Sequence, residues 1–231
     1  MSLLRDFLVA PRSGQSAVDG RGPPPSEESA IDGRGARRSR RVGVAASSPA
    51  APAIGVLAPA RDLPVAAAGV GLAIGRSAPA VLVCLSAPAF APALRAPARG
   101  AAARLAASLR ARELEASARG RLALVHLPDR GRTDAVRRAL AAADGLPTVL
   151  AVAGRDEEVD TVLAARDAIL VALPPSAEPA LAALALAGAA ELGPAAALSL
   201  TLDPAQRALA LAGVRAPRAL LVAVEELSPR M

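Results

Sequence analysis

Charged side chains follow several of the apolar runs in this chain, at the points where parallel strands would end. Guanidinium, imidazole and carboxylate groups in such positions can bind a small ligand or a protein partner, because open α/β sheets bind ligands at the carboxyl ends of their strands. Charges in loops are also commonly only solvated. The candidate residues of this rim are Arg61, Asp62, His126, Asp129, Arg155 and Asp156, with Arg130 and Glu178 beside them.

Cys84 and His126 are the remaining residues of these runs with reactive side chains. A Cys–His nucleophile pair fits their types, but an inert buried thiol and a separate rim histidine are the favoured interpretation. One Cys and one His cannot supply a four-ligand zinc site, and a single Cys excludes an internal disulfide. We therefore predict no catalytic residue, no metal and no cofactor.

The turn after the first apolar run is where a nucleotide-binding α/β protein carries its phosphate loop, a glycine-rich segment with a lysine. Here residues 58–64 read APARDLP, and the chain contains no lysine. Two prolines remove backbone donors, and Asp62 places a carboxylate where phosphate charge would go. The residues Gly69, Gly71 and Gly75 resemble a dinucleotide fingerprint, but they fall inside a predicted helix, where close helix–sheet packing explains them better.

The elements that position these residues alternate between apolar runs and helical patterns. We predict strands at 54–58, 80–86, 121–127, 147–153, 168–173 and 196–202, and helices at 64–76, 98–118, 132–144, 156–165, 177–192 and 203–213. Residues 219–227 are compatible with a strand or a helix, and we favour a strand for the first half. Buried strands that alternate with helices predict a three-layer, mostly parallel, doubly wound α/β sheet of about six or seven strands.

The first 45 residues are predicted to be a flexible, disordered tail, and residues 46–231 the folded domain. The tail is rich in Gly, Pro, Ser and charge, and residues 2–9 have the pattern of a short amphipathic helix. Val42–Val44 also fits a brief edge strand. An arginine cluster near the end of the tail can contact an anionic membrane, although a solvated charge run is the more ordinary interpretation. The cluster comprises Arg37, Arg38, Arg40 and Arg41.

Composition bounds the remaining possibilities. The 231 residues are 53% hydrophobic with a formal net charge of +6, and arginine supplies all 27 basic side chains. No aromatic residue lies among the tail arginines, so nucleic-acid binding is not expected. No secretory signal is visible, because Arg5 and Asp6 interrupt the apolar start. A cytoplasmic location, with possible peripheral contact at the inner membrane, is the expectation.

From 54 to about 225 the order of segments resembles the MinD/ParA-type ATPase family, whose members serve pilus-assembly and septum-placement systems. Residues 120–128 (GRLALVHLP) look like the strand before the regulatory helix of that family. Residues 147–175 resemble its next two strands, and 167–175 (DAILVALPP) match its unit of an aspartate, an apolar strand and proline. The resemblance implies a P-loop-NTPase-like, Rossmann-like fold.

The departures from that family concern its phosphate chemistry. Its phosphate loop has glycines and two lysines, and Ala153 or Gly154 stands where its metal-linked aspartate would be, with Asp156 too far along to be an assured substitute. Residues 85–88 (LSAP) replace its acidic motif after the second strand. Without these groups the electrostatic basis of phosphoryl transfer is missing. We therefore expect no ATP hydrolysis.

The leading hypothesis is a non-catalytic pseudo-ATPase that binds a protein partner, in pilus assembly or another cell-envelope system, and a homodimer is compatible with it. The first alternative is an α/β enzyme or sensor that binds a small nucleotide-like ligand at the carboxyl edge of the sheet. A receiver-like regulatory domain is a third, disfavoured because no acidic cluster follows the first strand.

Overall fold

The structure is a computed structural model, and it describes residues 51–85, 97–128 and 130–227. The predicted tail, its helix at 2–9 and the strand proposed at 42–44 lie outside these residues. In the described part of the chain, none of the helices is long and apolar enough to cross a membrane.

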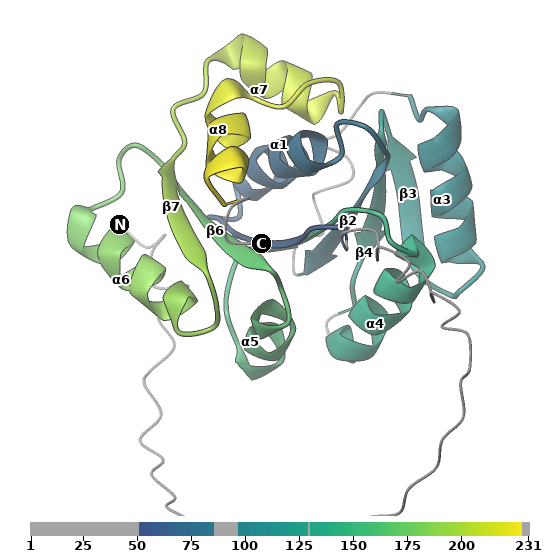
Figure 1. The fold of residues 1–231 in the computed structure, drawn as a ribbon, viewed down its shortest axis with the longest axis horizontal. Coiled ribbons are helices and arrows are strands. Elements are labelled where there is room, and N and C mark those ends of the chain that lie inside the picture. The colour runs from purple at the N-terminus through teal and green to yellow at the C-terminus, as the bar shows by residue number, and fades with distance from the viewer. Residues whose placement is uncertain (1–50, 86–96, 129, 228–231) are drawn as a thin grey trace, which may run out of the picture. The chain divides into compact units, whose positions relative to one another are not determined.

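Seven strands form one sheet in the order β3-β4-β2-β5-β1-β6-β7 (Figure 1). Every neighbouring pair is parallel except β3 and β4, which are antiparallel. This confirms the predicted doubly wound, mostly parallel α/β fold. The strands are β1 (Ala53–Leu57), β2 (Ala80–Leu85), β3 (Glu115–Arg119), β4 (Leu122–His126), β5 (Thr148–Val152), β6 (Ala168–Leu173) and β7 (Ala195–Ser199).

Helices cover both faces of the sheet because the central strands are apolar on both sides. In β6, for example, Ile169 and Val171 pack into one core, while Leu170 and Ala172 pack into the other. The first core lies under α3 (Gly100–Arg110), α4 (Arg132–Ala143), α5 (Glu157–Ala164) and α6 (Pro179–Ala190). The second lies under α1 (Leu63–Ile74), α7 (Pro204–Leu211) and α8 (Arg218–Leu227), as Figure 1 shows.

The predicted helix at 98–118 is wrong in its second half, which forms β3. Helix α3 ends at Arg110, and Glu113 then adopts a left-handed φ of 60°, with no glycine or proline to mark the stop. After it, Leu114, Ala116 and Ala118 are buried in alternation, which is the period of a strand.

The prediction of a strand at the start of 219–227 is also wrong, because this segment lies within α8. Its buried residues recur at the helical spacing i, i+3, i+4 and i+7. They are Leu220, Ala223, Val224 and Leu227.

The glycines of 69–75 lie in α1 and at its end, as predicted, and they permit close packing on both sides of this helix. A Cβ at Gly71 would lie 3.1 Å from Leu82 Cδ1, so this glycine lets α1 approach the sheet. A Cβ at Gly69 would collide with Leu220, so this glycine lets α8 pack against α1. These close contacts account for Gly69 and Gly71 as packing residues.

Candidate functional site

The carboxyl edge of the sheet has a change of helix side around β1, which lies between β5 and β6. The helix after β1 covers one face, whereas the helices after β5 and β6 cover the other. Such a switch point is where open α/β sheets bind ligands. The turn from β1 to α1 is therefore the first place to look for a site.

Three backbone N–H groups of this turn already donate to carbonyl oxygens of the protein. The N–H groups of Asp62 and Leu63 both donate to the Pro59 carbonyl oxygen, at 2.8 and 2.9 Å, and the Ala58 N–H donates to Val152 at 3.2 Å. Pro64 lies at the start of α1 and has no N–H. Asp62 occupies the N-cap position, but its side chain makes no capping bond, and α1 begins at Leu63.

The Asp62 carboxylate instead faces two guanidinium groups. Arg61 Nε lies 3.1 Å from Asp62 Oδ2, and Arg207 Nη1 of α7 lies 3.6 Å from Asp62 Oδ1. Arg207 also donates to the Arg61 carbonyl at 3.4 Å. The Asp62 side chain is 13% exposed, whereas both arginines are about half exposed. The two cations thus neutralise a largely buried carboxylate and retain one positive charge between the three groups.

An open pocket of about 330 Å³ adjoins this triad. Its lining combines apolar residues with the two arginines, so its chemistry suits a small anion with an apolar body. Its lining comprises Arg61, Asp62, Val65, Pro174, Pro175, Ser176, Leu200, Leu202 and Arg207.

Arg155 and Asp156 make their contacts with other parts of the fold. Arg155 binds Asp160 through Nε and Nη2, at 2.8 and 3.0 Å, and its side chain is only 12% exposed. Asp156 caps α5 by accepting from the Val159 N–H at 2.8 Å, and it accepts from Arg132 Nη1 at 2.5 Å. Neither residue lines the pocket beside Asp62, so these predicted rim residues belong to two separate groups.

Carboxylates lie at the starts of several helices along this edge. Asp156 and Asp203 cap α5 and α7, and Glu158 accepts from the Thr133 N–H of α4 at 2.7 Å. Asp62 and Glu178 hold the N-cap positions of α1 and α6. A helix N-terminus favours an anion. At the N-termini of α1, α4, α5, α6 and α7, however, a phosphate would meet a carboxylate.

Cys84 and His126 are register partners on the adjacent parallel strands β2 and β4. The thiol is fully buried, which raises its pKa well above the ordinary value. The Leu127 N–H donates to the Cys84 carbonyl at 3.0 Å, but no hydrogen bond joins the sulfur to the imidazole within the described residues. The raised pKa is the opposite of what an activated nucleophile needs.

The remaining candidates give less information. Asp129 and the tail residues Arg37, Arg38, Arg40 and Arg41 lie outside the described residues. Arg130 is exposed. Across the ranges that the structure describes, no group of three or more His, Cys, Asp or Glu side chains could hold a metal ion.

Two residues that matter here were not among the predicted ones. Arg207 lies far from Asp62 in the sequence, and only the fold brings them together. Arg132 is the first residue of α4, and its ionic partner is Asp156 at the N-cap of α5. Nothing in the local sequence around Arg132 indicates this partner.

Comparison with known proteins gives a structural similarity and no family match. A scan against models of protein families finds no match, and a search of curated proteins finds none either. Among solved structures, the chain is similar to a ParA family ATPase from Chlorobium tepidum TLS, with 15% sequence identity and a TM-score of 0.49. The match covers 79% of this chain and 90% of that chain. A similarity of this size assigns no activity, ligand or residue role to the present chain.

Proposed function

We propose that this protein is a non-catalytic, MinD/ParA-like pseudo-ATPase that acts by binding a protein partner, in positioning or assembling a cell-envelope machine such as a pilus. The observation that carries the proposal is the β1–α1 turn. Two of its N–H groups are bonded to Pro59 within the turn, and the Asp62 carboxylate lies beside them. Phosphoryl transfer depends on donors and cations aimed at the phosphates, and this turn has two prolines without an N–H, two N–H groups already bonded to Pro59, and no lysine.

A thermal-shift titration of the full chain with ATP and ADP, with and without Mg²⁺, tests this proposal. A ligand that binds only the folded state raises the melting temperature in a saturable way. We expect no saturable, Mg²⁺-dependent shift. Asp62→Ala is the informative variant: if triphosphate stabilises it but not the parent chain, the carboxylate is what excludes phosphate. Saturable stabilisation of the parent chain would overturn the proposal.

A second candidate function is recognition of a small anionic ligand, and the pocket beside Asp62 favours it. Arg61 and Arg207 are half exposed and outnumber the single carboxylate between them, so they retain capacity for a carboxylate or phosphate group. Nucleoside monophosphates and short-chain carboxylates are the probes. Arg207→Ala should abolish any stabilisation they give, whereas Arg215→Ala, which alters an arginine outside this pocket, should preserve it.

The tail arginines suggest peripheral contact with an anionic inner membrane from the cytoplasmic side, as part of the same proposal. Each cation near an anionic surface contributes about 1 kcal/mol. Replacement of Arg37, Arg38, Arg40 and Arg41 by serine in the full chain should reduce sedimentation with phosphatidylserine vesicles. Unchanged sedimentation would show that these arginines do not bind the membrane.

A further inference from the structure

Helix α6 is apolar all round although it lies at the surface. No charged residue occurs between Glu178 and Glu191, and the helix reads PALAALALAGAA. Only Ala185 and Ala189 are buried, while Leu184 is 49% exposed. A helix without a polar face is ordinarily covered on every side. The outer face of α6 is therefore suited to a contact with another molecule.

Strand β7 continues this uncharged surface at the end of the sheet. It pairs with β6 on one side and is the last strand in the order, so its other side has no strand partner among the described residues. Its sequence is AAALS, and Ala197 and Ser199 are exposed. Open edges in natural proteins are usually protected by charge, proline or a covering element. Strand β7 contains no charged residue and no proline. Together, α6, β7, Glu178 and Glu191 form what we call the apolar edge.

The opposite end of the sheet is rich in arginine. Residues 97–143, which include β3, β4, α3 and α4, contain ten arginines and four acids, a net charge of +6. Residues 144–203, which include α5, β6, α6 and β7, contain two arginines and nine acids, a net charge of −7. The strand order places β3 and β7 at opposite ends, as Figure 1 shows. Part of this acidic charge lies beside α4, because Asp156 pairs with Arg132 and Glu158 accepts from the Thr133 N–H, so the charges that distinguish the two ends are the exposed, unpaired ones.

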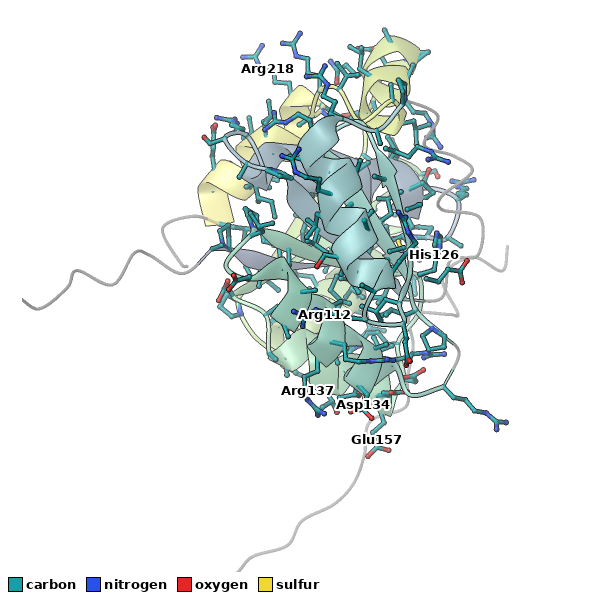
Figure 2. All side chains as sticks on the ribbon, turned by 90° about the vertical axis from the view of Figure 1, so that its right-hand side faces the viewer. Arg112, His126, Asp134, Arg137, Glu157 and Arg218 are labelled. Carbon is teal, nitrogen blue, oxygen red and sulfur yellow. The ribbon has the colours of Figure 1, made fainter. Side chains whose placement is uncertain are left out.

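Several of these charges have no ionic partner among the described residues. Figure 2 faces the end that carries α3 and α4, where Arg112 and Arg137 project from the surface. Arg137 pairs with Asp134, but four other arginines make no ion pair within the described ranges. These are Arg99, Arg104, Arg112 and Arg130, which with α3 and α4 form what we call the arginine edge. At the apolar edge, Glu178 and Glu191 are likewise exposed and unpaired in the described structure.

We propose that the apolar edge of one copy of this chain binds the arginine edge of a second copy. The occupant is a second copy because the unpaired charges at the two ends of the same molecule are opposite in sign and the described side chains that carry them are exposed. Opposite charges steer and orient the approach, and the apolar faces supply contact area. The long aliphatic stems of Arg104 and Arg112 can cover apolar surface while their guanidinium groups meet Glu178 and Glu191.

This contact is heterologous, so a bound pair of copies still has one free edge of each kind. Unless the rotation between copies closes a ring, further copies add to the assembly as the protein concentration rises. Because charge contributes to the contact, salt should weaken it. The association does not depend on the pocket beside Asp62, and it stands or falls separately from the proposed partner-binding function.

The test uses two variants of the full chain that each disable one edge. Leu184→Glu with Ala187→Glu places charge on the apolar edge, and Arg104→Glu with Arg112→Glu reverses charge on the arginine edge. All four side chains are exposed, so the fold should tolerate the changes. Val222→Glu and Arg218→Glu are matched controls on α8, because these two exposed residues are outside the sets that define the two edges. Sedimentation velocity over a concentration series at low and high salt gives the mass.

We expect the parent chain and both controls to form species larger than a dimer as concentration rises, and less so at high salt. Each edge variant alone should be monomeric. An equimolar mixture of the two edge variants should form a one-to-one dimer and nothing larger, because one intact edge of each kind remains, and this restoration also shows that both variants are folded.

Three results would overturn the proposal. The first is a parent chain that stays monomeric at every concentration. The second is a mixture of the edge variants that stays monomeric. The third is an edge variant that still associates alone, which would indicate a symmetric contact or another surface.

Discussion

Arg132 of α4 donates from Nη1 to Asp156 Oδ2 at 2.5 Å, and this bond joins the start of α4 to the start of α5. The Arg132 side chain is 14% exposed, whereas Asp156 is 52% exposed. The Arg132 Nε is buried with no hydrogen-bond partner. Asp156 therefore provides the compensating charge for a guanidinium that is largely withdrawn from water, in addition to its capping bond to Val159.

The stability contributed by Asp156 should depend on pH. Partial burial acts to raise the pKa of Asp156, but the Val159 N–H and the Arg132 guanidinium lower it, and the net pKa lies below its ordinary value. A carboxyl whose pKa is lower in the folded state stabilises the fold above its unfolded pKa of about 3.9 and loses that contribution as the pH falls through the folded value. We expect Asp156→Asn to lower the free energy of unfolding by about 1 kcal/mol at neutral pH, and the difference to shrink below about pH 4.

Urea unfolding of the parent chain and the variant across pH checks this expectation. Asp203→Asn is the matched control, because Asp203 caps α7 through Gln206 but makes no ion pair in the described residues. Asparagine caps a helix nearly as well as aspartate, so this control should change little. An Asp156→Asn cost that is the same at every pH would contradict the prediction.

Gly69→Ala should destabilise the fold although alanine is the better helix former. The added Cβ would collide with Leu220, which is fully buried, and would lie 3.0 Å from Pro217 Cδ. Overpacking of this kind costs about 1–3 kcal/mol, which exceeds a gain in helix propensity of at most about 1 kcal/mol. Gly100→Ala is the control, since its Cβ would meet only Arg104 Nη1 at 3.6 Å. Thermal melts that rank Gly69→Ala at or above the parent chain would refute the packing argument.

The Cys84 thiol should be inert in the native protein. Burial raises its pKa, so little thiolate forms, and the reagent must wait for an opening of the fold. Labelling with a disulfide reagent at mildly alkaline pH should be slow in buffer and fast in denaturant. His126→Ala should leave the native rate unchanged. A marked fall in that rate on removal of the imidazole would instead support a Cys–His pair.

Asp167 should hold the first residue of β1 against β6. Its Oδ2 accepts from the Ala53 N–H at 2.6 Å, and its own N–H donates to the Ala53 carbonyl at 2.9 Å. Asp167→Ala removes the side-chain acceptor and should cost about 1 kcal/mol, with faster hydrogen exchange at Ala53. Asp134→Ala is the control, because the Asp134–Arg137 pair is 74% exposed on both sides and should contribute less than about 0.5 kcal/mol. Equal exchange rates at Ala53 in the two variants would show that the Asp167 side chain is dispensable.

The sheet could be predicted from the sequence because its strands are apolar on both faces and its helices have clear repeats. The run 168–173 is β6 without any shift of its boundaries. Strand β3 was missed because its alternation, in Leu114, Ala116 and Ala118, is built from residues that also favour helices. The strand proposed within 219–227 failed because a run of Leu and Val suits either element, and the packing of Leu220 against Gly69 decides for the helix.

The candidate site was less predictable because its contacts join residues far apart in the chain. Local sequence located Arg61 and Asp62 at the carboxyl edge, and in the structure they lie in the turn between β1 and α1. It could not pair Asp62 with Arg207 or Asp156 with Arg132, since those pairs depend on how the helices pack. Nor could it show that Arg155 binds Asp160 and lies against Gly188 of α6, apart from the pocket that Arg61 lines.

The central position of β1 has a consequence for synthesis on the ribosome. Its two neighbours, β5 and β6, begin at Thr148 and Ala168, long after β1 and the buried helix α1 have left the exit tunnel. Until those strands emerge, the nascent chain exposes two unpaired edges of β1 and most of the apolar surface of α1. Long-range parallel pairing closes slowly and leaves such intermediates prone to aggregate. A holdase chaperone bound to nascent residues 53–74 would therefore protect this protein at its most vulnerable stage.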